Sequence, residues 1–144
     1  MRALGPYDFQ VLVGALLRAM GYSTPFIAPA GSDGCTDILA YSDPIGAKTP
    51  HVRVQVKHRN AQKATREEIA ALRGIIRQDR EIGLFVSSAG FTNEAMREAR
   101  HGQIHIELMD LNVLLEHWIV FYERLSEEDK GYLRLRHVHF LAPE

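Results

Sequence analysis

The sequence predicts a mixed α/β domain, a central sheet flanked by helices in the order α-β-β-β-α-β-α-β-α. Apolar residues recur at helical spacing in several segments, and short or strictly alternating apolar segments lie between them. Helices both precede and interleave the strands, which is typical of a layered α/β arrangement. The 144 residues suffice for one domain with a buried core and no disulfides.

The first helix is predicted to begin at Gly5-Pro6, since proline suits a first helical turn. Gly21 stands where a C-terminal cap belongs. The apolar face of this helix recurs at i, i+3, i+4 spacing and comprises Phe9, Leu12, Val13, Leu16, Leu17 and Met20. This face predicts a helix that packs against a sheet.

Three strands are predicted next, over residues 24–29, 36–42 and 51–58. The third alternates strictly, with three valines on one face and Arg53, Gln55 and Lys57 on the other. A hairpin-like meander is the simplest arrangement of the three. It brings the start of the second strand beside the third.

The second half of the chain alternates helices and strands. Thr65 to Glu68 forms a capping-box pattern that starts the second helix. Strands are predicted over residues 82–88 and 104–109, separated by a third helix over 92–100. That helix is expected to turn Ala95, Met96 and Ala99 inward.

Asp110 is expected to cap a fourth helix whose buried stripe comprises Leu111, Leu114, Leu115, Trp118, Ile119 and Tyr122. Val113, Val120 and Phe121 lie off that stripe and are surplus apolar surface for a partner or a covering tail. The expected division is a domain over residues 1–125 and a C-terminal tail over 126–144. The alternating stretch within the tail, residues 133–140, has no assigned place.

Composition excludes several classes of protein. Seventeen basic and eighteen acidic residues give a net charge of −1, which argues against a polybasic nucleic-acid binder. The single cysteine excludes an intrachain disulfide and a cysteine-based zinc site. No apolar stretch could span a membrane and no signal-peptide core is visible, so a cytoplasmic location is expected. The seven histidines lack the converging partners that a zinc site needs.

One set of polar residues suggests chemistry. Gln55 and Lys57 are two apart on one strand face, and a hairpin would bring Asp37 beside them. An acid, an amide oxygen and an ammonium suit a hydrolytic magnesium site, with the lysine orienting water and stabilising phosphate charge. Any solvated strand face carries similar polar residues, so spacing alone leaves that alternative open.

Other stretches of the chain match those of a known protein family and add to this pattern. They are Asp8-Phe9-Gln10 with Met20-Gly21-Tyr22, residues 31–38, residues 54–57, Leu72-Arg73-Gly74, and residues 85–92. With these stretches the chain, from about Leu4 to Tyr122, resembles the Mrr-type restriction endonuclease domain. That domain is a branch of the PD-(D/E)xK nuclease superfamily, so the resemblance implies a restriction-endonuclease-like core.

The resemblance implies roles residue by residue. Asp37 corresponds to the metal-binding aspartate and Lys57 to the catalytic lysine, while Gln55 replaces the usual glutamate, as is common in the Mrr branch. The carbonyl of Val56 is an expected further metal ligand, and Ser87 and Ser88 are expected nearby. Mg²⁺ is the expected cofactor, with Mn²⁺ as a substitute.

Two residues depart from the family pattern. Gln10 stands where the family commonly has glutamate, and Cys35 where it commonly has glycine. Asp37 is then the main carboxylate ligand, with Asp33 as a supporting acid, and bound DNA would complete the site. Cys35 is expected to be a tolerated small residue rather than a nucleophile.

The charges are unevenly distributed. Residues 51–80 hold eight basic and three acidic residues, a net of +5, whereas the remainder holds nine and fifteen, a net of −6. A phosphate-contacting surface is expected from this segment, comprising Arg59, Lys63, Arg66, Arg73 and Arg77. The alternative is an ordinary solvated helix face.

The expected function is a metal-dependent endonuclease that hydrolyses phosphodiester bonds in double-stranded DNA, in restriction of foreign or methylated DNA, leaving 5′-phosphates as the resemblance implies. A homodimer is expected because two strands need two sites, with the fourth helix as interface. A separate domain or subunit would recognise the DNA. The alternatives are a non-catalytic nucleic-acid-binding or scaffolding module, and a junction resolvase or repair nuclease.

Overall fold

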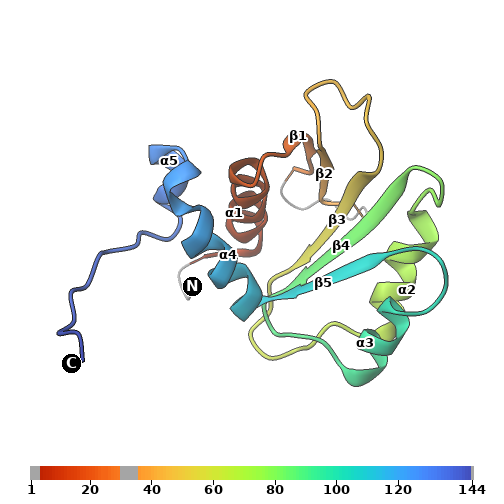
Figure 1. The fold of residues 1–144 in the computed structure, drawn as a ribbon. Coiled ribbons are helices and arrows are strands. Elements are labelled where there is room, and N and C mark those ends of the chain that lie inside the picture. The colour runs from red at the N-terminus through yellow and green to blue at the C-terminus, as the bar shows by residue number, and fades with distance from the viewer. Residues whose placement is uncertain (1–3, 30–35, 144) are drawn as a thin grey trace.

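A computed structural model describes residues 4–29 and 36–143. Five strands form one mixed sheet in the spatial order β1-β2-β3-β4-β5 (Figure 1). Their bounds are β1 Ser23–Ile27, β2 Ile38–Tyr41, β3 His51–Lys57, β4 Glu81–Ser87 and β5 Ile106–Asp110. The first three strands pair antiparallel, which confirms the predicted meander, and β3, β4 and β5 run parallel. The carboxyl ends of the parallel strands therefore meet at one edge of the sheet.

Helices cover both faces of this sheet, in the predicted order. They are α1 Pro6–Ala19, α2 Arg66–Ile75, α3 Asn93–Ala99, α4 Leu111–Phe121, the 3-10 turn η1 Tyr122–Arg124 and α5 Glu127–Lys130. α1 and α4 lie on one face, and α2 and α3 lie on the other (Figure 1). Among the described residues, no helix is long and apolar enough to cross a membrane.

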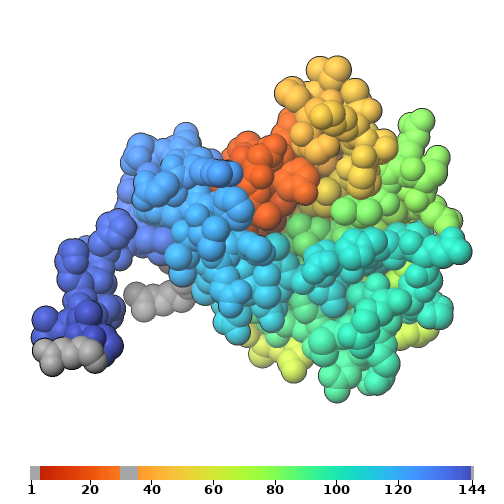
Figure 2. Space-filling view, in the orientation of Figure 1, coloured from red at the N-terminus to blue at the C-terminus, as the bar shows by residue number. Residues whose placement is uncertain are grey.

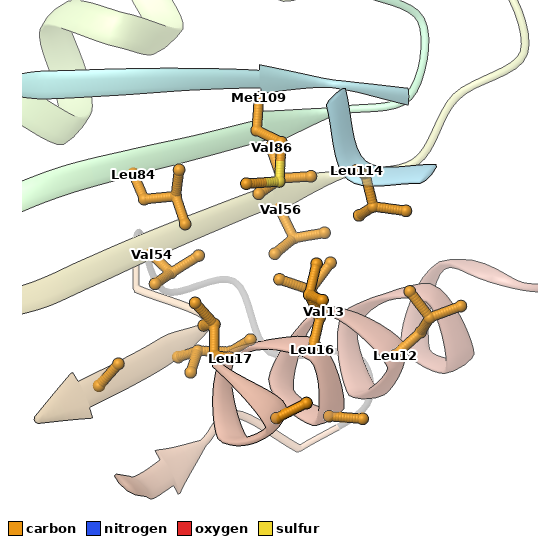
Figure 3. Close-up of a cluster of buried hydrophobic side chains, with 14 of the residues drawn as sticks. Leu12, Val13, Leu16, Leu17, Val54, Val56, Leu84, Val86, Met109 and Leu114 are labelled. Atoms are coloured by element: carbon orange, nitrogen blue, oxygen red, sulfur yellow. The ribbon is translucent and has the colours of Figure 1, made fainter. Parts of the chain in front are cut away.

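The larger core lies between α1 and the sheet (Figure 3). Leu12, Val13, Leu16 and Leu17 of α1 pack toward the valines of β3 and residues of the neighbouring strands. Gly14 allows this close approach, because a Cβ there would lie 2.9 Å from Cδ1 of Ile27. The inward valines of β3 leave Gln55 and Lys57 on the opposite face of the sheet, toward α2 and α3.

The second core is smaller and holds α2 and α3 against β4 and β5. Ile69 and Leu72 of α2 pack with Phe85 and Ala95, all fully or almost fully buried. The capping box predicted for α2 is present, with the hydroxyl of Thr65 accepting from the backbone N–H of Glu68. α2 therefore starts at a fixed position beside the end of β3.

Two residues predicted to be inward lie at the surface. Met96 is 37% exposed, because the short helix α3 covers the core with Ala95 and Ala99 alone. Ile119 is 61% exposed, because α4 directs Leu114 and Trp118 inward and turns Ile119 away. Val120 is exposed as expected.

A buried ion pair joins the starts of β3 and β4. The guanidinium of Arg53 donates to both oxygens of Glu81, at 3.0 and 2.8 Å, and to the hydroxyl of Thr36 at 2.7 Å. Burial would raise the pKa of Glu81, but the hydrogen bonds and charge of Arg53, with the backbone N–H of Arg77, lower it overall. The charged pair is therefore part of the folded structure at neutral pH.

Replacing Glu81 by glutamine is expected to lower the free energy of unfolding by about 2–3 kcal/mol at pH 7, because Arg53 loses its buried partner. A lowered pKa in the folded state contributes stability above the unfolded-state pKa, and that contribution is lost as pH falls through the folded-state pKa. The gap between variant and parent should therefore narrow in acid. Urea denaturation at pH 7 and in acid measures the difference in the free energy of unfolding between variant and parent. The exposed Glu94→Gln is the control. A pH-independent gap would contradict the role of the charge.

The C-terminal tail is anchored only at its start. The indole N–H of Trp118 donates to the carbonyl of Leu133 at 2.8 Å, and the backbone N–H of Leu135 donates to the hydroxyl of Tyr122 at 3.2 Å. Beyond this point residues 136–143 extend away from the domain without secondary structure (Figures 1 and 2). The alternating stretch is thus not paired with the sheet.

Candidate active site

Asp37 lies immediately before β2, where backbone hydrogen bonds hold it between two strands. Its N–H donates to the carbonyl of Val54 at 2.8 Å, and its carbonyl accepts from Ala28 at 2.7 Å. The β2–β3 register pairs Ile38 with Val54, which sets Asp37 opposite Gln55. Residues opposite each other in an antiparallel pair point to the same face. The predicted meeting of these two side chains therefore follows from the strand register.

The Asp37 carboxylate is held by two donors from β3. Its Oδ2 accepts from the side-chain amide of Gln55 at 3.1 Å and from the backbone N–H of Val56 at 2.7 Å. Among the described residues, no hydrogen bond reaches Oδ1. Asp37 is buried, with only 6% of the whole residue exposed. It is therefore fixed in orientation before any ligand arrives.

Burial raises the pKa of Asp37, although the N–H of Val56 and the charge of Lys57 act in the opposite direction. Desolvation disfavours the charged form of a carboxyl group, and a bound cation would reverse this preference. An acid that is costly to ionise without a counter-charge is common at functional sites. The electrostatics of Asp37 thus suit a cation ligand better than a structural salt bridge.

Gln55 and Val56 bring two further oxygens to Asp37. The amide nitrogen of Gln55 donates to Asp37, so the amide oxygen turns to the other side. The N–H and C=O of one strand residue point the same way, so the carbonyl of Val56 faces the Asp37 side of β3 together with its N–H. A carboxylate, an amide and a backbone carbonyl thus meet at this strand end, and the Gln55 amide would turn its oxygen toward a cation that bound there.

Lys57 ends β3 and is half-buried, opposite Ser87 in the parallel register. Its charge acts in the lowering direction on the pKa of Asp37, which burial nevertheless raises overall, and on that of Glu68 of α2, which Arg59 chiefly lowers. The ammonium thus belongs to a group of charges at the strand end. The catalytic role of Lys57 stays a prediction.

The pair of Glu68 and Arg59 was not anticipated. Arg59 donates to Glu68 through both guanidinium arms, Nη1 at 3.0 Å from Oε1. This hydrogen bonding is the main reason that the pKa of Glu68 is lowered, against the effect of burial. The capping box revealed the helix start and the Glu68 position, but nothing in the spacing connected it with Arg59. This pair forms the α2 wall of the site.

Ser87 ends β4 and Ser88 follows it, both near the end of β3, as expected. Ser87 is almost fully buried and its hydroxyl donates to the carbonyl of Gly90 at 2.8 Å, so it shapes the turn. Ser88 contacts the ring of His58 at 2.8 Å and the backbone of Arg59 on both its N–H and carbonyl. These contacts fix the chain just after Lys57.

Gln10 is not brought to the Asp37 side chain. Its amide donates to the carbonyl of Ala28 at 2.8 Å, and Ala28 in turn donates to the backbone carbonyl of Asp37. Gln10 therefore supports the segment beside Asp37 from α1. Asp33 and Cys35 lie outside the described residues.

The basic segment is partly neutralised by acids from other elements. Arg73 donates to the side chain of Glu98 at 3.0 Å and to the carbonyl of Ile104 at 3.2 Å, and Arg66 pairs with Glu98 at 3.4 Å. Arg73 thus joins α2 to α3, and its guanidinium is already engaged rather than free to contact phosphate. Within the described chain, Lys63 and Arg77 form no ion pair and are exposed. Fewer basic side chains are therefore free to contact an anion than the sequence predicted.

The donor set can be compared with the needs of a metal ion. Within residues 4–29 and 36–143, no group of three or more histidine, cysteine, aspartate or glutamate side chains could hold one. The oxygens of Asp37, Gln55 and Val56 nevertheless suit a hard divalent cation, which accepts few protein ligands when water and phosphate supply the rest. The residues present therefore fit Mg²⁺ or Mn²⁺.

The mixed five-stranded sheet with helices on both faces matches the fold of solved restriction endonucleases. The sequence profile of the Mrr catalytic domain, described as a restriction endonuclease, matches residues 1–118. The chain belongs to this restriction endonuclease family. A comparison with curated protein sequences finds no match.

Solved structures share the fold at low sequence identity. The MspJI restriction endonuclease in complex with a 27-mer oligonucleotide aligns over 88% of this chain and 32% of its own, with TM-score 0.67 and 17% identity. AspBHI, a DNA modification-dependent restriction endonuclease, aligns over 90% and 35%, with TM-score 0.66 and 18% identity. A repair endonuclease from Pyrococcus abyssi aligns over 74% and 47%, with TM-score 0.52 and 12% identity. The chain spans about a third of the first two.

Proposed function

We propose that this chain is a divalent-metal-dependent DNA endonuclease acting in restriction of foreign or methylated DNA. The observation that carries the proposal is the buried Asp37 carboxylate, oriented by Gln55 and Val56, with Lys57 at the next position after Gln55 on the same face of β3. A carboxylate oriented and desolvated in this way has little structural use, because it forms no ion pair within the described chain. Membership of the restriction endonuclease family supports the same reaction class.

In this proposal Asp37, Gln55 and the Val56 carbonyl hold Mg²⁺, or Mn²⁺ in its place. The bound cation would stabilise the negative charge that develops on the scissile phosphate. The N–H of Val56 and the amide of Gln55 keep the Asp37 carboxylate in one orientation, so no reorganisation is needed when substrate binds. Preorganised groups of this kind lower the barrier instead of merely improving substrate binding.

Lys57 is the residue proposed to act on the water and the phosphate. Its ammonium sits at the open end of β3, near the Asp37 carboxylate, and can hold a water for in-line attack on phosphorus while offsetting charge on the phosphate. The water oxygen forms the new bond to phosphorus and the 3′ oxygen leaves, which gives the expected 5′-phosphate product. Ser87 and Gln10 act through the backbone and position this strand end.

Double-stranded DNA is the proposed partner, contacted through the strand end and the start of α2. Lys63 and Arg66 are exposed near that start, and Arg77 is exposed at the far end of α2. Arg59 contributes a positive charge that Glu68 offsets in the free protein. Such contacts fix the position on DNA without reading sequence, so a separate domain or subunit is proposed to supply recognition. Two chains acting as a homodimer would cut both strands.

Metal removal tests the proposal. The chain is expected to nick supercoiled plasmid in Mg²⁺ or Mn²⁺ and to stop in EDTA. The reaction needs positive charge from the metal ion, and without that ion the Asp37 carboxylate brings only negative charge to the site. Methylated and unmethylated plasmids in parallel identify the substrate class. The absence of metal-dependent nicking on both plasmids, with DNA binding retained, would instead support a non-catalytic binding module.

That second function is favoured by one observation, the neutral amides of Gln10 and Gln55 where acids are common in nucleases. Calorimetric titration with Mn²⁺, with and without DNA, separates the two. A nuclease that needs DNA to complete its metal site takes up Mn²⁺ only in the second titration. The other alternative, a junction resolvase or repair nuclease, would show as preferential cleavage of four-way junctions over duplex.

A further inference from the structure

The edge of the sheet formed by β5 has no neighbouring strand within the described chain. Beside this edge a groove of about 470 Å³ runs between β5 and α3. Its lining is mixed, with apolar Met96, Ala99, Ile104, Ile106 and Leu108 beside polar or charged Arg100, Gln103, His105 and Glu107. An edge with open backbone groups and a partly apolar groove beside it is a place where a further strand can add.

The C-terminal tail has the sequence of a strand but no sheet to join. Residues 137–140 alternate, with Val138 and Phe140 on one side and His137 and His139 on the other, between Arg136 and Leu141, which do not follow the alternation. Val138 is 67% exposed and Phe140 is 85% exposed. Aromatic and β-branched residues favour strands, and leaving them in water forgoes their burial energy. Residues 136–143 are thus an extended segment that pairs with no strand among the described residues.

The two sides of the tail match the two sides of β5. Ile106 and Leu108 pack in the α2–α3 layer, whereas Glu107 alternates to the other side of β5, is exposed at the rim of the groove and contacts His105 at 3.2 Å. A strand added at this edge can place Val138 and Phe140 in the groove, which leaves His137 and His139 on the side of Glu107. Apolar side chains then meet apolar ones and imidazoles meet a carboxylate.

The anchor of the tail determines which sheet it can reach. Leu135 is bound to Tyr122, at the end of α4, and α4 puts about 16 Å between Tyr122 and the end of β5. Three residues separate Leu135 from Val138, a reach of about 10 Å even when extended. Figure 1 shows the tail leading away from β5. The tail therefore cannot reach the groove of its own chain without losing its anchor.

We propose that the tail of one chain adds as a strand to the β5 edge of a second copy, with Val138 and Phe140 in the groove of that copy. Reciprocal exchange of two tails closes a two-fold dimer and covers both open edges. The inference gives an interface to the homodimer proposed above, and it moves that interface from the face of α4 to the tail and β5.

Sedimentation of the free protein over a range of concentrations tests the exchange without any DNA or cleavage readout. Phe140→Glu and Met96→Glu are each expected to raise the dimer dissociation constant about tenfold or more, since each places a charge in a buried apolar contact. Ile45→Glu is the matched control, because Ile45 is also 85% exposed but lies between β2 and β3. Equal dissociation constants in all three variants, or a parent that stays monomeric at every concentration, would overturn the proposal.

A cysteine pair distinguishes the partner of the tail. With Cys35 replaced by serine, Phe140→Cys and Met96→Cys in one chain are expected to form a disulfide between chains, seen as a dimer on a non-reducing gel. Mixing tagged and untagged chains that carry one cysteine each should give the hybrid band. An internal disulfide within a monomer would show that the tail binds its own sheet, and no disulfide at all would show that the groove is not its site. Neither result bears on whether the chain cleaves DNA.

Discussion

Replacing Lys57 by alanine is expected to reduce metal-dependent DNA cleavage by about a thousandfold, which corresponds to roughly 4 kcal/mol of lost transition-state stabilisation. The ammonium lies at the end of β3 beside the Asp37 carboxylate, and the described chain places no second lysine on that strand face. Single-turnover nicking of supercoiled plasmid, at saturating protein and fixed Mg²⁺, measures the chemical step. The thermal midpoint should change little because Lys57 is half-buried and forms no ion pair among the described residues.

Lys48→Ala is the control, since Lys48 is exposed in the loop between β2 and β3 and lies in no proposed site. Uptake of Mn²⁺ in the presence of DNA should survive in Lys57→Ala, because the three oxygens that hold the cation remain. Cleavage equal to that of the parent would remove Lys57 from the mechanism. Loss of both cleavage and metal uptake would assign it to metal binding instead.

Replacing Asp37 by asparagine is expected to abolish cleavage to a similar extent while leaving the protein as stable or more stable at neutral pH. The physical reason is that burial raises the pKa of Asp37, so its charged form costs stability in the metal-free protein. Asparagine keeps an oxygen that can accept from the N–H of Val56 without that cost. Stability gained together with activity lost is the signature of a functional charge.

The pH dependence follows from the same shift. A pKa raised by folding contributes stability that is fully present below the unfolded-state pKa and is lost as pH rises through the folded-state pKa. The thermal midpoints of parent and Asp37→Asn should therefore converge in acid and differ at neutral pH. With DNA present to complete the site, Mg²⁺ should raise the midpoint of the parent only. A large drop in stability for Asp37→Asn, with Asp79→Asn unchanged as the exposed control, would give Asp37 a structural role.

Much of the fold could be predicted because it depends on local patterns. Alternation of valines in β3 and the capping residues Thr65 and Asp110 act over a few residues, and they placed the strands and helix starts correctly. The exposure of Ile119 could not be predicted. It depends on how α4 rotates against α1, which is set by the packing of Trp118 and Leu114 against residues more than ninety positions away.

The candidate site divides in the same way. The approach of Asp37 to Gln55 follows from a hairpin register, which spacing can suggest. The positive charge counted along residues 51–80 overstates the unpaired charge at the surface. Glu81 pairs with Arg53, and Glu98 pairs with Arg73. Those partners lie 25 and 28 residues away and meet only after the parallel strands have paired. Net charge along a segment therefore does not give the charge that a ligand would meet.

Ser88 has a position that matters for communication across the sheet. Its one hydroxyl contacts the ring of His58, which stacks on Phe9 of α1, and the backbone of Arg59, whose side chain holds Glu68 of α2. His58 also contacts the carbonyl of Leu4 at 3.1 Å. A displacement of the N-terminal segment at Leu4 would therefore be transmitted through the Ser88 side chain to the α2 wall of the site. The two helical layers, otherwise separated by the sheet, are mechanically coupled beside Lys57.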